Sequence, residues 1–236
     1  MRGHVKAWLL FVLATLLLGN SFAQQSNSPC GLSGFKSSKE KNLFSEQQEQ
    51  WLGEIIDSSI RQDFNVIDDP GGYLQKLGER LLAQLPPTKI RFHFAIIDSP
   101  ELNSFGGPGG FIYIHRRMIA FSQTEDELAA LLGHEIGHIV DHHVALRMTE
   151  WFGELGITSV GDKRDIFNKW NQFKNNAARI KSRNAEKHEE EEQLIADRIA
   201  VYAMSRAGYN SARAVEFGDR LLQTKGKAGG FWSDFF

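Results

Sequence analysis

Apolar residues recur at helical spacing in two segments near the start of the chain. Between residues 45 and 64 they return every three or four positions, until Asp69-Pro70-Gly71-Gly72 interrupts the pattern. A second set follows in residues 74–85 and stops at Pro86-Pro87. This spacing is typical of amphipathic helices, and Pro and Gly mark their ends. We therefore predict two helices in this part of the chain.

The next segment has the pattern of a small sheet. Residues 90–97 alternate imperfectly and are rich in aromatic and branched side chains, which favours a strand. Residues 103–110 hold four glycines and a proline and are predicted to be a loop, and residues 111–115 form a second short strand.

After these strands, apolar residues recur mainly at helical spacing as far as residue 207. Thr124 and Glu127 have the spacing of a capping box, and the apolar positions behind them predict one helix to about Met148. Residues 153–163 hold three glycines and are predicted to be a loop. Residues 165–207 are largely helical in pattern, with Gly208 as the C-terminal cap. The predicted fold class is α+β and mainly helical, with a small sheet.

The amino-acid composition limits the kinds of molecule that this protein is expected to bind. The 236 residues carry a net charge of −2 and are 42% hydrophobic, as in an ordinary globular protein. This balance gives no sign of nucleic acid binding. Cys30 is the only cysteine of the sequence, which excludes an intramolecular disulfide.

The N-terminus has the pattern of an export signal. Arg2 and Lys6 precede an apolar run at residues 7–18, and Ser21-Phe22-Ala23 supplies small residues for signal-peptidase cleavage. The run is shorter than the roughly 20 residues that span a bilayer. We predict a signal peptide at residues 1–23, with an uncleaved anchor as the alternative, and then a flexible leader at 24–44. The domain would occupy residues 45–236 in the periplasm or outside the cell, and peripheral membrane association stays open.

The segment HEIGH, residues 134–138, contains the strongest chemical signal. His134 and His138 are four residues apart, so a helix places both imidazoles on one face. Two such nitrogens can bind one Zn²⁺ at about 2.0–2.1 Å. Glu135 then has the place of a general base that takes a proton from zinc-bound water, as in H-E-x-x-H metallopeptidases. We predict one Zn²⁺ per chain.

A solvated polar helix rich in histidine is the alternative. Gly133 and Gly137 argue against it, because each costs about 1 kcal/mol in a helix interior relative to alanine. Such a cost suggests that another segment approaches the backbone closely. His142 and His143 have no metal-binding spacing of their own, and we predict structural roles for them.

Around this motif the sequence resembles the HtpX/BepA-like zinc metallopeptidases, which are peptidase family M48 and relatives of the CAAX prenyl endopeptidases. The resemblance covers roughly residues 45–225. It rests on TEDELAALLGHEIGH at 124–138, NSFGGPGGFIYI at 103–114, ADRIA at 196–200 and AGY at 207–209. The family usually has Asn-Ala-Phe where this chain has Asn103-Ser104-Phe105.

The resemblance implies a zincin-like catalytic domain with a third zinc ligand on a later helix. That ligand is usually a glutamate four residues before an aspartate, and the aspartate orients a ligating histidine. Asp197 fits the aspartate, but Gln193 stands four residues before it and Glu192 five. A π-bulge would bring Glu192 and Asp197 onto one face. We predict Glu192 as the ligand, with Gln193 as the alternative.

The predicted function is a zinc metalloendopeptidase that hydrolyses protein or peptide substrates of the cell envelope or outside the cell. The substrate strand would pair with an edge strand formed by Phe111, Ile112, Tyr113 and Ile114. The alternative is a chaperone-like binding protein on the same fold with a weak metal site. Tyr202 is the nearest candidate for stabilising an oxyanion. Family members commonly continue past this chain's last residue, so a truncated copy is one reading. The sequence leaves the oligomeric state open.

Overall fold

A mixed sheet forms the centre of the fold. The computed structural model describes residues 41–180 and 185–225. In these ranges the strands lie in the order β1 (Val66–Asp68), β2 (His93–Ile97), β4 (Phe111–His115) and β3 (Ser104–Gly106). β2 and β4 are parallel, whereas β1 and β3 are antiparallel to their neighbours. The predicted α+β, mainly helical class is confirmed.

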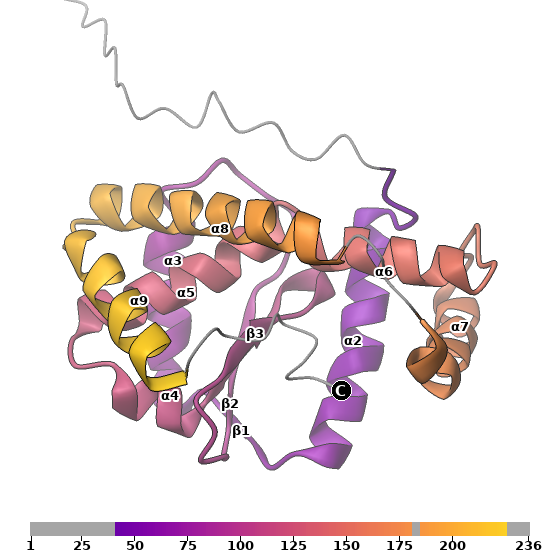
Figure 1. Ribbon diagram of the computed structural model, residues 1–236, viewed down its shortest axis with the longest axis horizontal. Coiled ribbons are helices and arrows are strands. Elements are labelled where there is room, and N and C mark those ends of the chain that lie inside the picture. Colours follow the sequence, from indigo (N-terminus) through magenta and orange to yellow (C-terminus); the bar gives the residue numbers. More distant parts are fainter. Residues whose placement is uncertain (1–40, 181–184, 226–236) are drawn as a thin grey trace, which may run out of the picture. The chain divides into compact units, whose positions relative to one another are not determined.

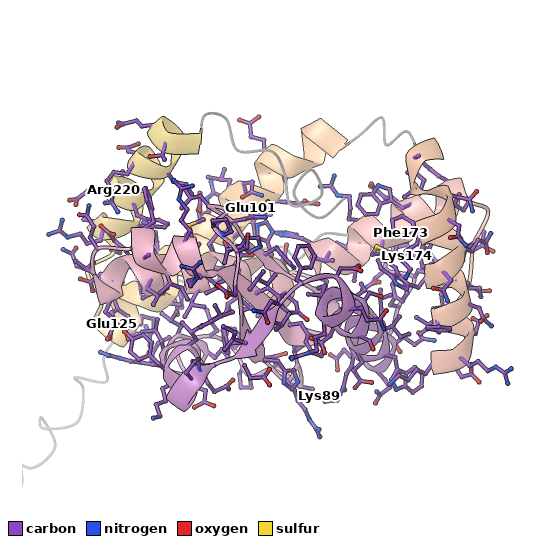
Figure 2. All side chains as sticks on the ribbon, turned by 90° about the horizontal axis from the view of Figure 1, so that it is seen from below. Lys89, Glu101, Glu125, Phe173, Lys174 and Arg220 are labelled. Carbon is purple, nitrogen blue, oxygen red and sulfur yellow. The ribbon has the colours of Figure 1, made fainter. Side chains whose placement is uncertain are left out.

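Helices cover both faces of this sheet (Figure 1). The α-helices are α2 (Glu46–Asp63), α3 (Tyr73–Leu82), α4 (Arg116–Phe121), α5 (Glu125–Val140), α6 (His143–Glu154), α7 (Lys163–Asn176), α8 (Ala185–Ala207) and α9 (Ala212–Lys225). Short 3₁₀ turns occupy Pro70–Gly72, Pro108–Gly110 and Ala177–Arg179. α8 runs along α5, and α7 packs on α2. Phe173 and Lys174 of α7 lie at one end of the described region, and Arg220 of α9 lies at the other (Figure 2).

The sheet separates two hydrophobic clusters. Ile112 and Ile114 pack with α3 and α5, while Tyr113 between them packs with α2 on the other face. This follows from the alternation of side chains along a strand. The helix that carries the histidines therefore lies on one cluster, and α2, α6 and α7 enclose the other.

The folded region begins before Ser45. Ser45 caps α2 as a capping box with Gln48, but Phe44 is also part of the core, with its ring centroid 5.7 Å from that of Phe152. The Leu43 amide donates to Thr149 Oγ1 at 2.9 Å. The predicted leader at residues 24–44 was therefore too long at its C-terminal end, because Leu43 and Phe44 belong to the fold. The predicted signal peptide at 1–23 lies outside the described residues.

The start of α5 confirms Thr124 as its N-cap. Thr124 Oγ1 accepts a hydrogen bond from the Glu127 amide at 3.3 Å. The Glu127 carboxylate reaches one residue further back than a capping box requires, because it accepts from the Gln123 amide at 2.7 Å.

The predicted single helix to Met148 is wrong. α5 ends at Val140, and α6 starts at His143 after a turn in which His142 has φ 58° and ψ 21°. This left-handed conformation is uncommon for a residue other than glycine. No glycine or proline marks the break, so the apolar spacing runs through it. His142 Nδ1 lies 2.9 Å from Glu49 Oε2, which holds the turn against α2.

Other elements depart from the prediction in small ways. The predicted loop at 103–110 contains β3, and the polar link before Thr124 contains α4. The helical pattern of residues 165–207 is divided between α7 and α8. Gly208 has φ +83° and ends α8 as expected. None of the helices in the described ranges is long and apolar enough to cross a membrane.

Candidate metal centre

His134 and His138 point their Nε2 atoms at a common position. These atoms are 3.0 Å apart. Two nitrogens bound tetrahedrally to one zinc at about 2.05 Å would be ~3.3 Å apart. The two imidazoles thus meet as the i, i+4 spacing on α5 requires, and small side-chain rotations would admit a shared metal ion.

The other ring nitrogen of each histidine has a buried or charged partner. His134 Nδ1 lies 2.8 Å from Asp197 Oδ1 on α8. His138 Nδ1 lies 2.9 Å from His143 Nδ1 on α6. A ligating histidine usually donates its second N–H in this way, which leaves the lone pair of Nε2 for the metal. The Asp197 contact has the geometry that the resemblance implied for this aspartate.

Burial and charge act differently on the two imidazoles. Burial is the largest single influence on His134 and disfavours its charged form, but the hydrogen bond to Asp197 and the charges of Glu135 and Asp197 together raise the His134 pKa. Burial lowers the His138 pKa well below its ordinary value, and the neighbouring His134 and His143 add to this effect. His138 is therefore neutral at pH 7, the form in which a histidine binds a metal.

Glu135 lies beside this pair and is 6% exposed. Ser104 Oγ donates a hydrogen bond to Glu135 Oε1 at 2.7 Å. Ser104 comes from β3, so the strand next to α5 fixes one carboxylate oxygen. The sequence singled out Ser104 only as a departure from the family's alanine, and its contact with Glu135 depends on how β3 packs against α5.

Gln193, rather than Glu192, faces the two histidines. α8 is α-helical through this segment, and the Gln193 side chain acts on both imidazoles, since it acts to raise the pKa of His134 and, against burial, that of His138. Glu192 instead pairs with the buried Arg147, with Nη2 and Oε2 2.6 Å apart. The π-bulge and Glu192 as third ligand are therefore contradicted. Arg147, which compensates the Glu192 carboxylate, lies 45 residues away on α6, so the sequence does not reveal this ion pair.

The two imidazoles fit a zinc ion in geometry, but the third donor is weak. Within residues 41–180 and 185–225, no three His, Cys, Asp or Glu side chains form a group that could hold a metal. The candidate set is thus two imidazole nitrogens and the amide oxygen of Gln193. A neutral amide oxygen offsets less of the charge of a partly buried dication than a carboxylate does.

The glycines of α5 allow α8 to come this close. A Cβ on Gly137 would lie 2.8 Å from Ala196 Cα, and one on Gly133 would lie 3.0 Å from Ala200 Cα. The predicted close approach is confirmed, and it is the backbone of α8 that approaches. The same contact brings Gln193 and Asp197 over the histidines.

The predicted substrate strand is not an edge. Phe111, Ile112, Tyr113 and Ile114 belong to β4, which pairs with β2 on one side and β3 on the other. The prediction was wrong because the residues before β4 were read as a loop. Of the described strands, β3 occupies this edge, and it lies against α5: a Cβ on Gly106 would be 3.3 Å from the Glu135 carbonyl oxygen.

Tyr202, the candidate for stabilising an oxyanion, lies on α8 five residues beyond Asp197. Its ring contacts the guanidinium of Arg206, with 5.5 Å between Cζ and the ring centroid.

Known proteins are similar in sequence to parts of this chain. The Beta-barrel assembly-enhancing protease of Escherichia coli K12 is 27% identical over 183 residues, which cover 74% of this chain and 38% of that protein. The Putative beta-barrel assembly-enhancing protease of Vibrio cholerae is 34% identical over 105 residues, 44% of this chain and 22% of that protein. The Mitochondrial metalloendopeptidase OMA1 of Schizosaccharomyces pombe is 30% identical over 73 residues, 31% of this chain and 22% of that protein.

The chain spans well under half the length of each of these relatives. A family model described as Peptidase family M48 matches residues 69–225. This match includes α5 with its histidines and α8 with Gln193 and Asp197. Because it covers more than half of the sequence, this chain belongs to peptidase family M48.

Proposed function

We propose that this protein is a zinc-dependent metalloendopeptidase with one Zn²⁺ per chain. The observation that carries the proposal is the convergence of His134 and His138, whose Nε2 atoms are 3.0 Å apart, beside the buried carboxylate of Glu135. Gln193 would supply an amide oxygen as third ligand, and Asp197 would orient His134. The match to peptidase family M48 supports the same reading.

Zinc would polarise the scissile carbonyl and make water more acidic. Glu135 would then take the proton of the attacking water and pass it to the leaving nitrogen. Ser104 Oγ donates to Glu135 Oε1 at 2.7 Å and so would orient the carboxylate for this proton transfer.

The substrate would be a peptide or protein segment in extended conformation. An added strand could pair with the outer edge of β3, whose main chain runs next to Glu135. Main-chain pairing of this kind binds many sequences, since the hydrogen bonds come from the backbone.

The protein would act after export, on proteins of the cell envelope or outside the cell. Residues 1–23 carry the pattern of a signal peptide, and a cleaved chain would start at Gln24. N-terminal sequencing of the exported protein would test the cleavage.

Gln193 favours a second candidate function, a binding or chaperone-like protein with little hydrolysis. A third ligand without charge would weaken zinc binding and lower the fraction of chains that carry the metal. The two candidates differ in whether the natural Gln193 site hydrolyses peptide bonds.

The test measures zinc content by mass spectrometry and casein hydrolysis with and without chelator. The enzyme proposal expects hydrolysis that the chelator abolishes. Glu135→Gln should keep the zinc and lose activity by about 10²–10⁴-fold, the usual loss on removing a general base. His138→Ala should lose the zinc as well. Activity of Glu135→Gln within a factor of about three of the natural protein would exclude this role.

Gln193→Glu separates the two candidates. If the natural protein binds zinc and hydrolyses casein, the amide is a working ligand and the enzyme proposal holds. If only Gln193→Glu does so, the natural protein is the binding protein of the second candidate.

A further inference from the structure

His138 is oriented differently from His134. His134 Nδ1 meets a carboxylate directly, at 2.8 Å from Asp197 Oδ1. His138 Nδ1 meets a second imidazole, at 2.9 Å from His143 Nδ1. The opposite nitrogen of that imidazole, His143 Nε2, lies 2.9 Å from Asp141 Oδ2. The three side chains thus form a chain of hydrogen bonds, Asp141–His143–His138.

The carboxylate fixes every proton in this chain. An ionised carboxylate only accepts hydrogen bonds, so His143 must carry its proton on Nε2 and donate it to Asp141. In a neutral imidazole the other nitrogen is an acceptor, so His143 Nδ1 takes the Nδ1–H of His138. His138 is left with an unprotonated Nε2, the atom that faces His134 Nε2 at 3.0 Å.

We propose that Asp141 and His143 are positioning residues that hold His138 in the tautomer and ring orientation needed to bind a metal. The inference rests on the proposed metal site. It assigns a role to His143, for which the sequence suggested only a structural one. The two histidines would thus each be oriented by a carboxylate, His134 directly and His138 through an intervening imidazole.

The backbone is shaped for this contact. Residues five apart on a continuous helix lie about 140° apart around its axis, so His143 could not reach His138 if α5 continued. The left-handed His142 turns the chain between them. Such a conformation is unfavourable for a residue other than glycine, and the contact between His142 and the 4%-exposed Glu49 offsets this cost.

Burial makes the chain of hydrogen bonds stable. His143 is 3% exposed and Asp141 is 7% exposed. Water therefore competes little for these bonds, and an unpaired nitrogen here would be costly.

The first measurement uses the full protein without zinc. Nitrogen-15 NMR of the histidine rings distinguishes protonated from unprotonated ring nitrogens. We expect His138 to be protonated at Nδ1 and unprotonated at Nε2, with His143 protonated at Nε2. A His138 ring protonated at Nε2 would overturn the proposal, and this result depends neither on hydrolysis nor on any variant.

The second measurement compares His143→Leu with His143→Asn. The asparagine Oδ1 can take the place of Nδ1 and accept from His138, whereas leucine removes the acceptor at similar volume. We expect His143→Leu to weaken zinc binding by about 10–100-fold in a chelator competition, as loss of an orienting partner usually does. His143→Asn should stay within about threefold of the natural protein.

The outcomes are distinguishable from a failure of the proposed function. Equal zinc affinity in His143→Leu and the natural protein would show that His143 does not position His138. Equal loss in both variants would show that it acts only through packing. Absence of zinc binding in the natural protein would overturn the metal site. The ring tautomers of the metal-free protein would still show whether Asp141 and His143 hold His138 in the proposed tautomer.

Discussion

Glu192 and Gln193 are neighbours in sequence, but they have unrelated partners because successive side chains on an α-helix point about 100° apart. Gln193 acts to raise the pKa of both histidines. Glu192 forms an ion pair with Arg147, which is 7% exposed. A shift of one position along α8 therefore changes the role from candidate metal ligand, at Gln193, to partner in a structural ion pair, at Glu192.

Glu192→Gln should lower stability without removing the metal. It removes a charged partner of the mostly buried Arg147 guanidinium, and a hydrogen bond to a charged group contributes about 1.5–3 kcal/mol. Urea unfolding of the metal-free protein would measure this loss, with Glu191→Gln, an exposed position on the same helix, as the control. Loss of zinc at unchanged stability would make Glu192 the ligand again.

At the scale of elements, the site depends on how closely α5 and α8 pack. Gly133 and Gly137 leave room for the α8 backbone at Ala200 and Ala196. A helix with larger residues at these positions would hold α8 further away, and Gln193 and Asp197 would withdraw from the histidines with it.

Gly137→Ala should therefore destabilise the protein and weaken zinc binding together. The added methyl would lie 2.8 Å from Ala196 Cα, and overpacking of this kind costs about 1–3 kcal/mol. Gly218→Ala on α9 is the matched control, because its Cβ would meet nothing within 4 Å. Replacing a helical glycine there should stabilise by up to about 1 kcal/mol. Thermal unfolding and zinc titration of both variants would check this, and a neutral Gly137→Ala would refute the tight contact.

Elements with local signals could be predicted from the sequence. Ser45 and Thr124 cap α2 and α5 through bonds within three residues, and the spacing of His134 and His138 is a property of any helix. The turn at His142 could not be predicted, because Glu49, which holds it, lies 93 residues away. β3 is recognisable as a strand only through its pairing with β4.

The candidate site divides in the same way. His134, Glu135 and His138 follow from one short motif, and Asp197 followed from the family resemblance. The contacts of Ser104, His143 and Gln193 depend on packing between elements, so the residue types alone did not assign them. Glu192 was chosen on charge, which was the wrong criterion because its charge is neutralised by Arg147.

At the scale of the whole molecule, α5 is the element on which the others meet. It contacts α3, α8, α9 and β3. Its first turn holds α9 through Glu127, which is 1% exposed and accepts from Arg220 Nη1 at 2.8 Å and Nη2 at 2.7 Å. The Arg220 guanidinium also lies 5.1 Å from the Phe121 ring centroid. Figure 2 labels Arg220 on α9.

This pair predicts a defined response to acid. The hydrogen bond from Arg220 lowers the Glu127 pKa below its ordinary value of 4.5, although burial acts the other way. A carboxyl with a lowered pKa in the folded state adds stability that is complete above the unfolded pKa and disappears as pH falls through the folded pKa. The difference in unfolding free energy between the natural protein and Glu127→Gln should therefore be constant at neutral pH and close below about pH 4.5.

Urea unfolding at a series of pH values would measure that difference. Glu216→Gln is the control, since Glu216 forms an exposed ion pair with Arg213 on the same helix, and exposed pairs contribute little. A gap between the natural protein and Glu127→Gln that persists unchanged through the acid range would contradict the assignment.

The two orienting contacts differ in when they can form. His138 and His143 are five residues apart in sequence, whereas His134 and Asp197 are 63 apart. Contacts close in sequence form earlier, since a shorter loop has to close. During synthesis from the N-terminus, the hydrogen bonds Asp141–His143–His138 can form as soon as α6 has folded. The contact between His134 and Asp197 can form only after α8 has been made and has packed on α5. We therefore expect a newly made chain to hold zinc weakly at first, and to retain it only after its last helices have docked.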